Sequence, residues 1–271
     1  MLKKFVARLA AVGLALTFVF TPLQAKAEER DVFLHVNDTY ILYTTPIAPY
    51  IDENNRFMLP LRAVSELLGA TVDYHPDERR AQITFDGRST ELYIGSPNAI
   101  VNGESITYDT EPVLYKNSMI VPLRVLLDAF SLQAEWKGGT VAISDDRVMK
   151  TQRLNEIEDL DRNLQHVDRP TAFSVKRASV DMERVTEGAN TTETIHLSVT
   201  VQNITGADIP EGKMDLVTTF LHPDRYTFEH YADTKERPPV KKDATYTLEK
   251  SKSTINSPLS YILLKARTIE P

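Results

Sequence analysis

The sequence contains no cysteine, so the chain forms no disulfide and has no thiol nucleophile. Its stability must come from packed cores, for which 42% hydrophobic residues are sufficient. Basic residues are also scarce, because 31 Lys and Arg stand against 38 Asp and Glu, a net charge of −7. Binding to nucleic acid or to anionic lipid needs clustered positive charge. We therefore expect no nucleic-acid partner.

Long hydrophobic runs are absent after the N-terminal segment. Residues 1–27 carry Lys3, Lys4 and Arg8, then an apolar run over 9–20, and end in small residues at 25–27. This pattern predicts a secretory signal peptide cleaved after Ala27, since a spanning helix needs about 20 apolar residues. The mature chain then keeps 27 basic and 38 acidic residues, a net charge of −11. We expect a secreted, extracellular or cell-wall-associated protein with no membrane span in the mature chain.

An internal repeat is the main feature of what remains. Residues 58–74 (MLPLRAVSELLGATVDY) return 62 positions later as residues 120–136 (IVPLRVLLDAFSLQAEW). Upstream, Val36-Asn37-Asp38 is matched by Val101-Asn102-Gly103. A period above roughly 50 residues is too long for a solenoid unit. The repeat therefore predicts two copies of one small module packed together.

Each copy changes from strand to helix periodicity and back. The spacing of Leu61, Val64, Leu67 and Leu68 predicts a short helix, with Pro60 in its first turn and Gly69 as a left-handed cap. The second copy predicts a helix over 122–130, with Ser131 as a less relaxed cap. Alternating strands flank both helices, so each copy is expected to place one helix on an antiparallel sheet.

The doubled Pro-Leu-Arg helix, preceded by a Val-Asn turn and followed by a strand that ends in Tyr74 or Trp136, resembles a known family. Residues 32–146 are similar to the copper amine oxidase-like N-terminal domain, also called the stalk domain. The resemblance implies a bacterial extracellular setting, in which such modules accompany secreted or wall-associated domains. Asp38 and Ser131 depart from the glycines of the pattern.

The remaining chain divides into a connector and a second domain. In residues 147–169 the apolar positions from Leu154 to Val167 recur every three or four residues, which predicts a polar amphipathic helix that either packs on a domain or acts as a mobile spacer. Residues 170–271 return to period two and predict a β-sandwich, and the run 196–210 resembles immunoglobulin-like domains. The predicted fold class is α+β, with tandem antiparallel sheet-plus-helix modules, a helical connector and a small all-β sandwich domain.

The sequence carries no recognisable catalytic motif. The nucleophile, metalloprotease and phosphate-loop motifs are absent, and so are the Asn-Tyr-Asp/Glu and His-x-His segments of copper amine oxidases. The histidines are scattered, and only His222 and His230 could meet across a hairpin, although two surface histidines are the favoured interpretation. The acidic clusters at 145–146 and 156–159 are expected to be solvated. We predict no enzyme activity, no catalytic residue, no cofactor and no metal site.

Four residues are candidate ligand contacts. Arg62 and Arg124 occupy matched positions, where they either contact an anion or serve structure by binding carbonyls or pairing with an acid of the other copy. Tyr226 and Phe228 share one face of a predicted strand and form either a stacking platform for sugars or part of the sandwich core. Trp136 and its counterpart Tyr74 are expected to pack in the core.

These observations favour a non-catalytic secreted or cell-envelope-associated bacterial protein that acts as a structural or binding module. Cell-wall polysaccharide and another extracellular protein are the expected partners. The alternative is an accessory protein that binds extracellular polysaccharide or hydrolyses an extracellular polymer, since paired carboxylates for sugar hydrolysis meet only in the folded chain.

Overall fold

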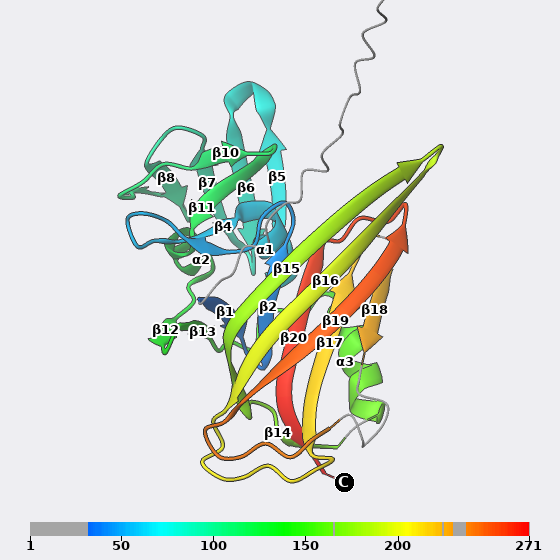
Figure 1. Ribbon diagram of the computed structural model, residues 1–271. Helices are drawn as coiled ribbons and strands as arrows, with labels where there is room; N and C mark the ends of the chain where they lie inside the picture. Colours follow the sequence, from blue (N-terminus) through cyan, green and yellow to red (C-terminus); the bar gives the residue numbers. More distant parts are fainter. Residues whose placement is uncertain (1–31, 165, 224, 230–236, 271) are drawn as a thin grey trace, which may run out of the picture.

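The computed structural model describes residues 32–164, 166–223, 225–229 and 237–270 (Figure 1). The predicted signal peptide, residues 1–27, lies outside them. The described part of the chain is mostly β, with three α-helices and several antiparallel sheets, which confirms the predicted fold class. No helix within it is long and apolar enough to cross a membrane.

The N-terminal part alternates short strands with two helices. Its first half contains β1 (Phe33–Val36), β2 (Thr39–Thr44), β3 (Tyr50–Ile51), β4 (Phe57–Pro60), α1 (Leu61–Leu68), β5 (Thr71–His75), a 3-10 turn (Pro76–Glu78) and β6 (Arg80–Phe85). Its second half contains β7 (Arg88–Tyr93), β8 (Asn98–Val101), β9 (Glu104–Thr107), β10 (Val113–Tyr115), β11 (Ser118–Pro122), α2 (Leu123–Phe130), β12 (Ala134–Lys137) and β13 (Thr140–Ile143).

The C-terminal part contains one helix and longer strands. Its elements are α3 (Gln152–Leu164), β14 (Val167–Arg169), β15 (Phe173–Glu187), β16 (Asn190–Asn203), β17 (Met214–Leu221), β18 (Tyr226–Glu229), β19 (Thr245–Ile255) and β20 (Tyr261–Ile269). The predicted connector helix is therefore shorter than expected, because Val167 to Arg169 form a strand paired with β20.

The two short helices begin and end at matched positions. Pro60 and Pro122 are the last strand residues and cap the helices, rather than lying in the first turn as predicted. Gly69 ends α1 in the left-handed region with φ 104°, and Ser131 ends α2 there with φ 53°. Their N–H groups donate to the last-turn carbonyls of Glu66 and Asp128. The predicted C-terminal caps, Gly69 and Ser131, are confirmed.

The central sheet of the N-terminal part joins the two halves. Its strand order is β10-β11-β4-β3, and β4 pairs antiparallel with β11, with Leu59 opposite Val121. A five-stranded sheet, β5-β6-β7-β8-β9, also combines strands of both halves. Both helices contribute buried side chains to the core that these sheets enclose. The halves are thus interleaved and share one core.

Strands β1 and β2 are buried on both faces, because they belong to two cores at once. Leu34 and Ile41 face the N-terminal core, whereas Phe33, Tyr40 and Leu42 face the C-terminal one. The eight-stranded sheet that contains them has the order β12-β13-β1-β2-β20-β17-β18, with β14 beside β20. The two parts of the chain are therefore continuous through a sheet.

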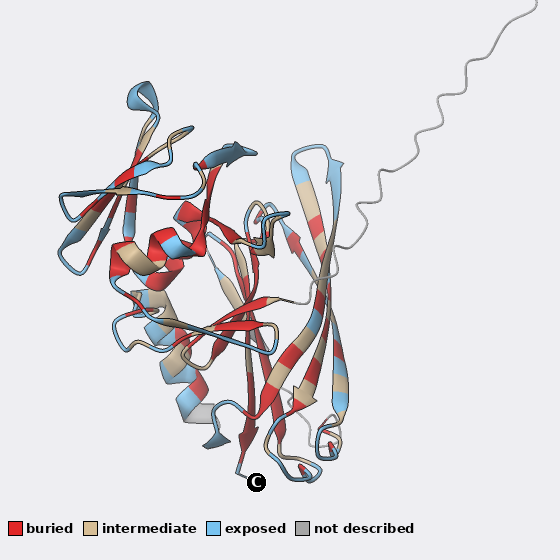
Figure 2. Ribbon diagram, turned by 90° about the vertical axis from the view of Figure 1, so that its left-hand side faces the viewer, coloured by how far each residue is buried: buried red, intermediate tan, exposed pale blue. Residues whose placement is uncertain are grey.

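The second layer of the C-terminal part is the antiparallel sheet β15-β16-β19. Its inner side chains, such as Val175, Leu197 and Leu248, pack in the C-terminal core with residues of β17 and β20. The β15–β16 hairpin continues beyond this core, and Figure 2 shows its tip exposed.

Helix α3 packs against the folded parts, which confirms the first of the two alternatives for the connector. Ile157 is buried in the N-terminal core, and Arg153 donates a 2.7 Å hydrogen bond to the carbonyl of His222. Leu160, which was expected on the same apolar edge, is exposed.

Candidate functional site

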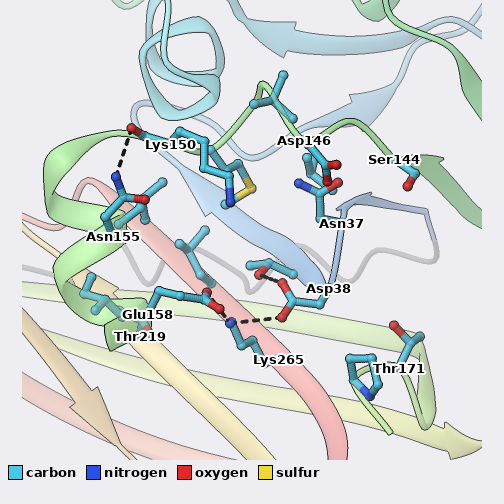
Figure 3. A pocket seen from close by; sticks show the side chains of 18 residues that line it. Asn37, Asp38, Ser144, Asp146, Lys150, Asn155, Glu158, Thr171, Thr219 and Lys265 are labelled. Atoms are coloured by element: carbon cyan, nitrogen blue, oxygen red, sulfur yellow. Dashed lines mark hydrogen bonds and ion pairs between the residues drawn. The ribbon is translucent and has the colours of Figure 1, made fainter. Parts of the chain in front are cut away.

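A large pocket lies where the N-terminal part, α3 and β20 meet (Figure 3). Its volume is about 390 Å³, and its polar lining includes Asn37, Asp38, Asp146, Glu158 and Lys265. Asn37 is already engaged, because its side-chain amide donates to the Asp145 carbonyl at 3.2 Å and accepts from the Asp145 N–H at 3.0 Å.

At the floor of this pocket one lysine pairs with two carboxylates. Lys265 Nζ lies 3.0 Å from Asp38 Oδ2 and 2.8 Å from Glu158 Oε2. Burial acts to lower the pKa of Lys265, but the two carboxylates outweigh it and raise that pKa. Burial likewise acts to raise the pKa of Asp38, but Lys265 and the hydrogen bond from Thr39 bring it below its ordinary value.

A deeper ion network continues from this pocket into the protein. Arg267 donates to both oxygens of Asp161, at 2.5 and 2.6 Å, and to Asp215 at 2.9 Å. Arg237 lies 3.1 Å from the other oxygen of Asp215. These side chains come from α3, β17, β20 and the segment before β19. Since Lys265, Asp38 and Glu158 are paired with one another across its floor, we interpret the large pocket as a joint between the parts of the chain.

Two smaller pockets lie on the N-terminal part and have a different character. The first, the Trp136 pocket, has a volume of about 290 Å³. Its lining consists of Arg56, Phe57, Asp109, Pro122, Leu123, Arg124, Leu127, Ala134, Glu135, Trp136 and Val141. Trp136 is 60% exposed, although we predicted that it would pack in the core.

The second, the Tyr74 pocket, has a volume of about 140 Å³. Its lining consists of Leu61, Arg62, Val72, Tyr74, Ala81, Leu114, Asn117, Ser118 and Met119. Tyr74 is 40% exposed, so the prediction of a core position is wrong for it as well. The aromatic ring and the arginine of each pocket occupy the matched positions of the repeat.

The match between the pockets extends beyond these two side chains. Six lining pairs are separated by 62 residues, namely Leu61 and Leu123, Arg62 and Arg124, Val72 and Ala134, Tyr74 and Trp136, Arg56 and Ser118, and Phe57 and Met119. A seventh pair, Ala81 and Val141, stands opposite Tyr74 and Trp136 in the two strand ladders. The same pocket is therefore built twice.

The pairing of β4 with β11 explains why each pocket uses both halves. The two strands are antiparallel, and each leads directly into its helix. The start of β11, at Ser118, therefore lies beside the start of α1, and residues Arg56 and Phe57 lie beside the start of α2. Neither half alone contains a complete pocket.

Exposure of the two rings follows from their place along the strand. Val72 and Tyr74 point to the same face of β5, and only Val72 reaches the core. Two residues advance a strand by about 6.6 Å, so Tyr74 lies beyond the edge of the core that Val72 reaches. Strands β5 and β12 are both at a sheet edge, and no neighbouring strand flanks them there. Alternation in the sequence predicts which face of the strand a side chain is on, but it does not predict where along the strand the core ends.

The pocket arginines are exposed and paired within their own helices. The Arg62 side chain is 54% exposed, with Nη1 3.3 Å from Glu66. The Arg124 side chain is 78% exposed, with Nε 3.7 Å from Asp128. We expected a structural role in which the two arginines bind carbonyls or pair with an acid of the other copy. In the structure each arginine instead pairs with an acid of its own helix.

The rim of the Trp136 pocket is fixed by a turn before β4. Asp52 accepts hydrogen bonds from the N–H groups of Asn54 and Arg56 and from Arg56 Nε, the last at 2.7 Å. Partial burial acts to raise the pKa of Asp52, but these hydrogen bonds lower it overall. Arg56 also donates to the Asp109 carbonyl at 3.3 Å, so this wall is held in place.

The other two candidate contacts lie in a different place. Tyr226 is half-buried on β18 and packs against the N-terminal core rather than in the core of the sandwich. The backbone of Phe228 pairs with Thr219 in the sheet. They share no pocket with Arg62 or Arg124 among those found in the described residues.

The prediction that His222 and His230 are surface histidines is wrong for His222. His222 is fully buried rather than on the surface, and its Nδ1 lies 3.0 Å from the Ser257 carbonyl. His230, its proposed partner, lies outside the described residues. Across the described ranges, no group of three or more His, Cys, Asp or Glu side chains is placed to hold a metal ion.

Comparison with known protein families now places the part of the chain that carries both small pockets. Residues 35–144 match the copper amine oxidase N-terminal domain. The match covers both halves as one domain, which agrees with their interleaved sheets and common core. The described residues do not fit a copper centre, because they lack a metal-ligand group. No curated protein shows significant sequence similarity to this chain. The match to the copper amine oxidase N-terminal domain therefore gives the position of the domain in the chain.

Proposed function

We propose that this chain is a non-catalytic binding protein that acts outside the cell, with the copper amine oxidase N-terminal domain as its recognition element. Three features support the proposal: the signal-peptide pattern of residues 1–27, a domain typical of bacterial extracellular proteins, and the two matched pockets. The acidic charge of the chain favours a partner other than nucleic acid.

The matched pockets carry the proposal. Each presents an exposed aromatic ring beside an exposed arginine, and core packing requires neither side chain to stay in water. An aromatic ring, an arginine and an apolar floor recur 62 residues apart, and in both pockets the ring and the arginine are exposed.

The rest of the chain supports this surface. We interpret the two halves of the domain as copies of one unit, and the C-terminal part as an immunoglobulin-like sandwich that shares β1 and β2 with the domain. Tyr261 donates a 3.0 Å hydrogen bond to the carbonyl of Ala63 in α1, which fixes the C-terminal sheet behind the domain. In this proposal the C-terminal part holds the recognition domain in a constant orientation.

Sedimentation with purified bacterial cell walls tests the proposal. The mature chain, residues 28–271, is expected to be retained by the walls, and the Arg62→Ala/Arg124→Ala variant to be retained less. The matched control is Arg88→Ala/Lys242→Ala, which also removes two exposed positive charges but lies outside both pockets. A wild-type protein that stays in the supernatant at all ionic strengths would overturn the wall-binding function. Equal loss in the control would show that net charge alone causes retention.

A further inference from the structure

The exposed rings of the two small pockets need a partner that covers them. Trp136 is 60% exposed and Tyr74 is 40% exposed. Each ring lines its pocket together with apolar side chains. A ring in this position gains free energy when an apolar surface displaces the water on its face. The positions of the two rings are equivalent, so the same kind of partner fits both.

We propose that each pocket holds one pyranose ring of an extracellular polysaccharide, stacked on Trp136 in one pocket and on Tyr74 in the other. This inference rests on the proposed function and names its ligand class. A pyranose presents a flat C–H face, which packs on an aromatic ring, and a rim of hydroxyl groups, which need hydrogen-bond partners.

Both pockets supply those partners around the ring. In the Trp136 pocket the donor is the Arg124 guanidinium, and Glu135 is a carboxylate acceptor in the same lining. In the Tyr74 pocket the donor is the Arg62 guanidinium, and Asn117 and Ser118 supply amide and hydroxyl groups. The lining of each pocket therefore contains both donors and acceptors, as a hydroxyl-rich ligand requires.

The electrostatics favour a neutral sugar over an anion. Glu66 lies 3.3 Å from Arg62, and Asp128 lies 3.7 Å from Arg124, so each arginine already has a carboxylate beside it. A site for phosphate or for a lone carboxylate would leave its guanidinium charge unpaired. The paired guanidinium groups retain N–H donors for hydroxyl oxygens.

The size of the pockets favours a polymer over a small molecule. The volume of about 140 Å³ lies below the roughly 300–1,000 Å³ of sites that enclose a whole drug-sized ligand, and the volume of about 290 Å³ lies at the lower end of that range. A shallow pocket of this size takes one ring of a chain that continues over the surface. Two such pockets on one rigid domain then bind the same insoluble material at two points, which raises the overall affinity through effective concentration.

The two pockets should differ in strength. The Trp136 pocket has the larger ring, the larger volume and the more exposed arginine. We therefore expect it to contribute more to binding than the Tyr74 pocket.

Tryptophan fluorescence offers a direct test, because Trp136 is the single tryptophan of the chain. The mature protein is titrated with hexamers of β-1,4-linked N-acetylglucosamine, glucose and xylose, and with soluble fragments of purified cell-wall glycan. At least one probe is expected to change the emission in a saturable manner. Calorimetry with that probe should show about tenfold weaker binding for Trp136→Ala and a smaller loss for Tyr74→Ala.

The outcomes separate this inference from the proposed function. Phe at position 136 keeps a flat ring, so Trp136→Phe should retain much of the affinity that Trp136→Ala loses. Wall retention that survives the Trp136→Ala/Tyr74→Ala change, with no response to any glycan, would overturn sugar stacking but leave the binding function standing. Retention that depends on wall protein and not on glycan would also overturn it. No retention of wild type would instead remove the proposed function itself.

Discussion

Leu59 pairs with Val121 in the middle of the contact between β4 and β11, and the two residues hold the same position in the two halves of the domain, 62 residues apart. Around this pair the register is self-complementary, since Met58 faces Pro122 and Pro60 faces Ile120. This is the residue pattern of an isologous, twofold contact. The contact explains why the domain has two composite pockets rather than one pocket in each half.

The centre of this contact should be critical for stability. Leu59 is fully buried, so Leu59→Ala is expected to lower the free energy of unfolding by about 2–5 kcal/mol. Urea denaturation followed by circular dichroism measures the effect. Leu114→Ala is the matched control, because Leu114 is 55% exposed on β10 of the same sheet. Comparable losses in both variants would contradict a twofold core centred on Leu59.

The buried network around Arg267 gives a second prediction. Arg267→Ala removes the arginine that pairs with buried Asp161 and leaves Asp215 paired with Arg237, and removal of one member of a buried ion pair costs about 3–5 kcal/mol. Arg162→Ala, which breaks exposed pairs with Glu158 and Asp159 on the same α3, should cost about 0–1 kcal/mol. Thermal unfolding of both variants beside wild type makes the comparison. Small and similar shifts of the melting temperature in both variants would contradict a contribution of the buried network to stability.

The C-terminal ends of both helices and the strand-helix-strand order could be predicted from the sequence, because they depend on local signals such as Gly69 and the spacing of Leu61 to Leu68. Pro60 and Pro122 precede their helices by one residue instead of lying in the first turn. The sharing of β1 and β2 between two cores could not, since alternation in Phe33 to Val36 does not identify which residues cover each face. Strand β19 has a weak sequence signal, because its apolar residues are sparse and Leu248 alone among them is buried in the core.

For the candidate site, the sequence identified Arg62 and Arg124 but not the rings beside them. Tyr74 and Trp136 were assigned to the core because large aromatic residues in strands are most often buried. The signal that could have corrected this is in the neighbours of Trp136, where Glu135, Lys137 and two glycines mark the end of an edge strand. The large pocket could not have been predicted, because Asp38, Glu158 and Lys265 meet only in the folded chain.

The ion pair of Asp38 with Lys265 predicts a dependence of stability on pH. The folded pKa of Asp38 is lowered, so its contribution is present above the unfolded pKa and is lost as the pH falls through the folded one. The pKa of Lys265 is raised, so its contribution persists below its unfolded pKa and disappears only in strong alkali. Asp38→Asn should therefore cost about 1–3 kcal/mol at pH 7 and progressively less below about pH 5.

Urea midpoints at several pH values between 7 and 3 test that dependence. The difference between wild type and Asp38→Asn isolates one carboxyl from the other acids, which titrate in both proteins. A difference that stays constant over this range would show that the Asp38 charge makes no contribution to folding.

The two helix caps give a prediction in which matched positions respond in opposite directions. Gly69 has φ 104°, a backbone conformation in which any residue with a side chain is strained. A Cβ there would lie 4.0 Å from the Phe85 ring. Gly69→Ala should therefore destabilise the protein by about 1–2 kcal/mol. Ser131 already carries a side chain at φ 53°, so Ser131→Gly relieves strain and should stabilise it by about 0.5–1 kcal/mol after the added entropy of glycine in the unfolded chain. Melting temperatures of the two variants should lie on opposite sides of the wild-type value, and a decrease in both would mean that Ser131 stabilises its cap through its side chain.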